Sequence, residues 1–184
     1  MEVLTQTLSV SPIELMNKYK NGERPEYKPS NTDKPQKELE ALAEKYKQTM
    51  SVDTKVELLN KELGMLYEEI QHPELTLSRN YEDISKVMPK NIRGQELEDT
   101  LKLFDITGIT RMERLGGVYR HKTPEERIDI LKEAYKTFDE TNASGNRAKS
   151  FIITVLSNIE ERNPEHKSKI SEVYDELYKV TNSE

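Results

Sequence analysis

Apolar residues recur along most of the chain at the three- and four-residue spacing of helices, and the alternation typical of strands is scarce. Residues 36–50 predict one helix and residues 52–71 predict a second. The apolar positions of the second helix have a strict heptad period: Val52, Val56, Leu59, Leu63, Leu66 and Ile70. This narrow stripe fits a helical hairpin within the chain or a coiled coil between chains. The pattern leaves open whether the two segments form a hairpin or one long helix.

The last third of the chain has the clearest helix signals. Thr123-Pro124-Glu125-Glu126 predicts a capping box with proline at the first helical position, and a helix follows. Residues 142–146 predict a loop of small residues. The helix predicted over 147–162 has a wide apolar arc, so we expect it to be the central one. Asn163 and Pro164 introduce a final helix, and the three helices together predict a bundle.

The first 36 residues have a different pattern. Ser11 and Pro12 open a short predicted helix, and Asn21-Gly22 ends it. Its apolar residues are Ile13, Leu15, Met16 and Tyr19. A proline-rich segment with almost no aliphatic residues follows and predicts an extended linker. Because so short a helix is not stable alone in water, we expect it to dock either on its own chain or on a partner.

These elements predict an all-α protein, a multi-helix bundle of about six to eight helices with an extended N-terminal arm. We expect three segments. They are an arm over residues 1–36, a helical hairpin with short helices over 37–122, and a three-helix bundle over 123–184.

Composition narrows the functional classes. The chain contains no cysteine, which excludes disulfides, thiolate metal sites and thiol nucleophiles. No stretch approaches the roughly 20 apolar residues that span a bilayer, and residues 1–10 lack the pattern of a secretory signal. We therefore expect a cytoplasmic protein, or one inside a particle assembled in the cytoplasm, that does not bind membranes. The net charge of −6 disfavours nucleic acid unless a local basic face exists.

Residues 95–122 contain such a face and have the outline of a helix-turn-helix. One predicted helix ends at Phe104, Gly108 lies in the turn, and a second helix is predicted over 109–120. Between residues 111 and 122 the arginines and lysines are Arg111, Arg114, Arg120 and Lys122, and Glu113 is the single acid there. A recognition helix needs its apolar side packed and its arginines directed outward. DNA binding through these residues is the second interpretation, and a solvated basic face is the alternative to it.

Signals for catalysis are few. Glu69 and His72 have the Glu-x-x-His spacing of di-iron helical bundles, but the motif occurs once and Pro73 follows it directly. We predict no metal site and no cofactor. No nucleophile, base and acid can be grouped from their order in the chain, so we expect no enzymatic activity, with a metal-dependent helical enzyme as a third interpretation.

The sequence is best interpreted as a non-catalytic helical module that binds another protein or copies of itself. An adaptor, an inhibitor or an assembly component of a phage or virion particle would fit this description. We expect the contact to involve the arm, through Ile13, Leu15, Met16 and Tyr19. If the heptad stripe is exposed, we expect Leu59, Leu63 and Leu66 to contribute as well.

Overall fold

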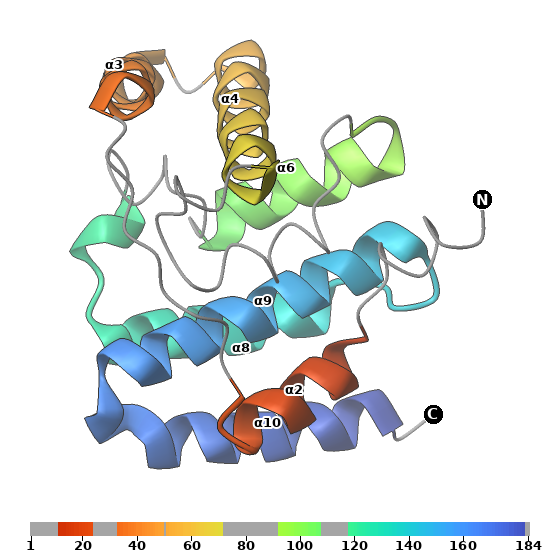
Figure 1. Cartoon of the computed structure of the whole chain (residues 1–184). Helices are drawn as coiled ribbons and strands as arrows, with labels where there is room; N and C mark the ends of the chain where they lie inside the picture. Colours follow the sequence, from red (N-terminus) through yellow and green to blue (C-terminus); the bar gives the residue numbers. More distant parts are fainter. Residues whose placement is uncertain (1–10, 24–32, 50, 72–91, 108–117, 183–184) are drawn as a thin grey trace.

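The computed structural model describes residues 11–23, 33–49, 51–71, 92–107 and 118–182, and at 33–36, 66–71, 107, 118 and 120 only the backbone. Within these ranges the chain is all-α, which confirms the predicted fold class (Figure 1). The α-helices are α2 (Pro12–Lys20), α3 (Asp33–Thr49), α4 (Val52–Gln71), α6 (Gln95–Thr107), α8 (Pro124–Thr137), α9 (Ala143–Arg162) and α10 (Lys167–Asn182). Two short 3-10 helices are η2 (Val118–His121) and η3 (Pro164–His166).

Helix α9 is the centre of the molecule, as its wide apolar arc predicts. It packs against α2, α6, α8 and α10. In Figure 1 the pair α2 and α10 lies on one side of it, and α6 with the α3–α4 hairpin lies on the other. Ile152, Ile153 and Leu156 are completely buried. A helix that packs on several sides needs apolar residues around most of its circumference.

Helices α8 and α10 pack beside α9 and against each other. The capping box at the start of α8 is present: the Thr123 hydroxyl accepts the Glu126 amide at 3.2 Å, and the Glu126 carboxylate accepts the Thr123 amide at 2.9 Å. The predicted stripe is buried in the main core: Ile128, Leu131 and Tyr135 lie in α8, and Phe138 is the C-cap residue that follows it. Local capping and the apolar stripe therefore act together to place this helix.

The start of α9 differs from the prediction. Residues 143–146 were expected in a loop, whereas α9 already begins at Ala143 with Asn142 as its N-cap. The Asn142 side chain accepts the Gly145 amide at 2.7 Å, which satisfies one of the free donors of the first turn. Gly145 also lies against the preceding turn, because a Cβ there would be 1.9 Å from the Asp139 carbonyl oxygen. Small side chains here allow the first turn of α9 to lie close to the preceding turn. Composition alone predicted a loop, because small residues are also typical of loops.

Helices α3 and α4 form a hairpin, which decides between the two arrangements that the sequence left open. Their interface uses residues outside the heptad stripe, Leu58 and Met65, which cluster with Leu39, Ala43 and Tyr46 of α3. Phe104 of α6 closes this second cluster and meets the Tyr46 ring edge-on at 5.3 Å between centroids. The stripe residues Leu59 and Leu63 instead join the main core. Leu59 and Leu63 therefore lie on the side of α4 that packs on the main core, and Leu58 and Met65 lie on the side that packs on α3.

The main core joins all three segments of the sequence. It includes Leu15 from the first, Leu59 and Leu103 from the second, and Ile152 and Leu177 from the third. Within the described residues, this core therefore draws side chains from both sides of residues 36 and 122.

Candidate interaction surface

Helix α2 begins with a capping box at Ser11 and docks on its own chain. Leu15, Met16 and Tyr19 are almost completely buried in the main core, and Ile13 is partly buried against it. The Tyr19 hydroxyl lies 3.3 Å from the Thr154 hydroxyl of α9. Of the two docking modes expected for the arm, the structure therefore has the intramolecular one. A partner can reach these side chains only if α2 leaves its place.

The end of α2 is linked to α10 by an ion pair. Lys20 Nζ lies 2.5 Å from Asp175 Oδ1, and both side chains are partly solvated. The hydrogen bond from Lys20 and its charge hold the pKa of Asp175 below its ordinary value. Exposed pairs of this kind contribute little to stability, so the buried side chains are the main attachment of α2.

The hairpin residues that we expected to bind a partner are also inside the protein. Leu59 and Leu63 are buried in the main core. The side chain of Leu66 lies outside the described residues. Their availability to a partner depended on an exposed stripe, and Leu59 and Leu63 are not exposed.

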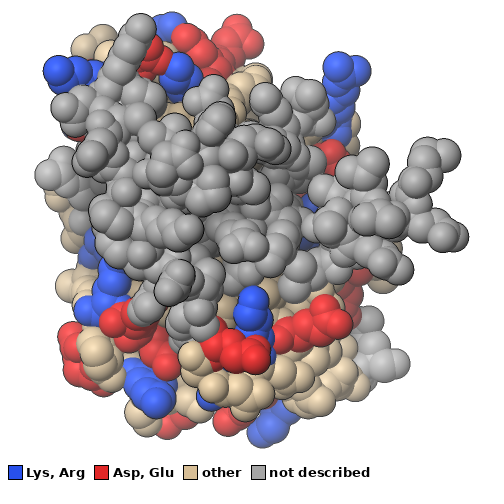
Figure 2. Space-filling view, in the orientation of Figure 1, with Lys and Arg blue, Asp and Glu red and all other residues tan. Residues whose placement is uncertain are grey.

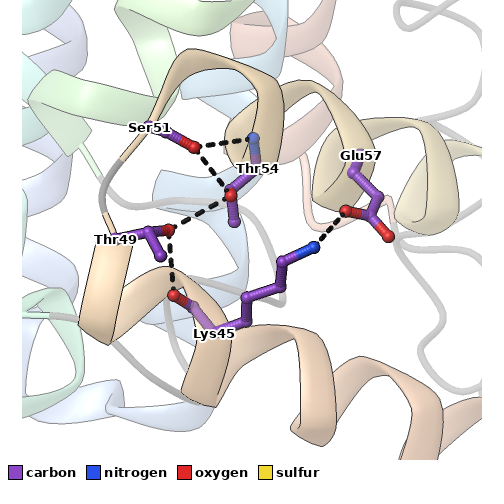
Figure 3. Close-up of polar contacts among 5 residues, drawn as sticks. All are labelled: Lys45, Thr49, Ser51, Thr54 and Glu57. Carbon is purple, nitrogen blue, oxygen red and sulfur yellow. Dashed lines mark hydrogen bonds and ion pairs between the residues drawn. The ribbon is translucent and has the colours of Figure 1, made fainter.

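The turn of the hairpin is held by hydroxyl groups (Figure 3). The Ser51 hydroxyl accepts the Thr54 amide at 3.2 Å and donates to the Thr54 hydroxyl oxygen at 2.8 Å. The Thr49 hydroxyl lies 3.1 Å from the same Thr54 oxygen and donates to the Lys45 carbonyl at 3.0 Å. Lys45 also pairs with Glu57 across the hairpin at 3.0 Å. These contacts fix the end of α3 and the first turn of α4 relative to each other.

Val52, the first residue of α4, is presented by this turn to solvent. Its exposed fraction is 63%, larger than that of the other exposed large hydrophobic residues among the described ones. Lys55, one turn further along α4, pairs with Asp105 near the end of α6. The next residue of α6, Ile106, is 40% exposed. The candidate interaction surface consists of this turn with Val52 and of Ile106 at the end of α6, which the Lys55–Asp105 pair joins to α4; we call it the turn surface.

Sequence reasoning missed this surface because Val52 continues the heptad spacing of Leu59 and Leu63. Periodicity assigns a residue to a face of a helix, but it does not tell whether a neighbour covers that face at the helix end. Ser51 as an N-cap was the available signal, since it places Val52 in the first turn beside the connection.

The predicted basic residues are largely outside the described part of the chain. Arg111 and Arg114 lie beyond it, and only the backbone is described at Arg120. Lys122 is half-buried just after η2. Residues 118–121 form a 3-10 helix, so the expectation of an α-helix to residue 120 is wrong for its last turn. Tyr119 is buried there, and the Arg127 guanidinium lies 5.0 Å from the centre of its ring.

Polar side chains near the starts of α6 and α9 pair with one another. Arg147 Nη1 lies 2.6 Å from Glu96 Oε1, and Asp99 accepts hydrogen bonds from Ser144 and, at 3.0 Å, from Gln95. These contacts join two helices and leave the carboxylates with donors.

Lys149 is buried close by on α9. It lies 3.3 Å from Glu140 Oε2 and 4.8 Å from the centre of the Tyr135 ring. Burial raises the pKa of Tyr135, while its hydrogen bond with Thr181 acts in the opposite direction. The lysine charge is thus compensated by a carboxylate and an aromatic face.

The described residues contain no group of three or more side chains that could hold a metal ion. The Glu-x-x-His spacing at Glu69 and His72 cannot be examined in the structure, because the Glu69 side chain and His72 lie outside the described residues. On the face in Figure 2, acidic and basic side chains are interspersed where α2 and α10 lie. Mixed charge of this kind is typical of a solvated surface.

Comparison of the chain with known families, with curated proteins and with solved structures gave no match. Among the described helices, none combines the length and the hydrophobicity needed to cross a membrane. The class established by the fold is an all-α multi-helix bundle.

Proposed function

We propose that this protein is a non-catalytic interaction module that binds a protein partner through the turn surface. The observation that carries the proposal is the 63% exposure of Val52 on a turn braced by Thr49, Ser51 and Thr54. Exposed aliphatic side chains on a pre-ordered support suit binding, because little conformational entropy is lost when the partner arrives. The buried positions of Leu15, Met16 and Tyr19 favour this surface over the arm.

The test is capture of a partner from the cells that make the protein, with wild type and Val52→Asp compared. Aspartate at the first helical position favours the helix, so the variant should keep its melting temperature. Placing a charge at a central apolar contact should weaken capture about tenfold or more. Val180→Asp is the matched control, because Val180 is 39% exposed on α10, away from the hairpin.

A second variant separates the turn surface from the arm. Lys20→Cys with Asp175→Cys in this cysteine-free chain can be joined by a short bis-maleimide, which holds α2 on α10. We expect the cross-linked protein to capture the same partner as wild type. Capture that is lost on cross-linking and unaffected by Val52→Asp would assign binding to the arm. Capture that disappears after nuclease treatment would favour the helix-turn-helix interpretation.

A further inference from the structure

The face of α9 under α2 has an unusual composition for a buried surface. Ser150, Thr154 and Ser157 are spaced as successive turns of one helix face, and all three are completely buried. Thr154 contacts the Tyr19 hydroxyl, so this is the face to which α2 is attached. The opposite face carries aliphatic residues, including Ile152 and Leu156.

The hydroxyl groups of Thr154 and Ser157 on this face differ in their hydrogen bonding. Thr154 donates to the Ser150 carbonyl within α9 at 3.1 Å, so the Tyr19 hydroxyl must donate to Thr154. The Ser157 hydroxyl is buried without a hydrogen-bond partner. A buried hydroxyl gains hydrogen bonds when water reaches it, whereas an aliphatic stripe would lose its main stabilisation.

Helix α2 depends on its packing against the rest of the chain for its helical conformation. It is nine residues long, and a helix of that length does not persist in water without packing. Releasing it would expose Leu15, Met16 and Tyr19 but would return conformational freedom to the whole segment. The aliphatic side chains on the opposite face of α9 would not be exposed by that release.

From these observations we propose that α2 is a reversibly docked cover on α9 and α10. It opens as a unit while α8, α9 and α10 stay folded, and opening exposes the hydroxyl-lined face of α9. The cover is independent of the turn surface, because the two lie at opposite ends of the molecule (Figure 1).

Native-state hydrogen exchange of the full chain tests the cover. The relevant α2 amides are those that donate within the helix and its C-cap, such as Leu15, Asn21 and Gly22. We expect them to exchange together, at least about tenfold faster than the slowest amides of α8, and with a weaker dependence on denaturant. Equal rates and equal denaturant dependence in α2 and α8 would overturn the proposal, because α2 would then open only with the whole protein.

Tyr19→Phe gives a second, independent readout. Loss of the Tyr19 hydroxyl should speed α2 exchange roughly two- to tenfold without changing α8. Tyr178→Phe, on an exposed α10 tyrosine, is the matched control and should change neither helix. The 20–175 cross-link should bring α2 exchange down to the rate of α8. Equal acceleration of α2 and α8 by Tyr19→Phe would contradict a separate opening.

Discussion

Helices α4 and α9 both contain 20 residues, yet they differ in how many sides they bury. α9 contacts four other α-helices, whereas α4 packs chiefly against α3 and reaches the main core through Leu59 and Leu63. The first residue of α4 is exposed, while α9 is buried from Ser144 onward along most of its length. Burial on several sides makes a helix structural, and burial on fewer sides leaves surface free for a partner.

The largest expected effect on stability comes from truncating a buried side chain of α9. Leu156→Ala in α9 should lower the free energy of unfolding by about 2–5 kcal/mol. The side chain is completely buried, so its removal would leave an enclosed cavity. Leu39→Ala in α3 removes an equally buried side chain but from a small cluster that can close around the gap. We expect it to cost less, near the lower end of that range. Chemical denaturation measures both variants, and a larger loss for Leu39→Ala would contradict the ranking.

Two glycines offer a comparison of opposite sign. Gly145→Ala should destabilise by about 1–3 kcal/mol, since the new Cβ would be 1.9 Å from the Asp139 carbonyl oxygen. Gly64 lies in α4 with nothing within 4 Å of a Cβ. Gly64→Ala should therefore stabilise by about 0.5–1 kcal/mol through the reduced freedom of the unfolded chain. Thermal melts of the two variants test this prediction. Melting temperatures that shift in the same direction would contradict the difference in local space between Gly145 and Gly64.

The smallest expected effect concerns the surface between α8 and α10. Hydrogen bonding and charge from Lys136, with a further contribution from Lys132, lower the pKa of Glu176. A carboxyl group with a lowered folded-state pKa contributes stability above its unfolded pKa of about 4.3. That contribution is lost as the pH falls through the folded-state value. Melting temperatures between pH 6 and 3 should fall slightly less for Glu176→Gln than for wild type; identical profiles would exclude a role for the pair.

Local signals predicted the elements whose ends depend on nearby residues. The capping box at Thr123 and Glu126 is satisfied by backbone groups within one turn, so its geometry follows from the sequence. The apolar arc of α9 predicted its central place, because a wide arc has no stable solvent-facing arrangement.

Tertiary packing decided where the arm and the exposed surface lie. Tyr19 and Thr154 are 135 positions apart in the chain, and no periodicity links them. The burial of Ser150 and Ser157 depends on other elements covering α9, although hydroxyl residues usually indicate solvent. The exposure of Val52 arises at the end of the hairpin, where α4 begins beyond the cover of its neighbours. By itself, the sequence determined the helices and their apolar faces, because these follow from contacts within a few turns; only the tertiary structure decided which face meets which neighbour and which stays in water.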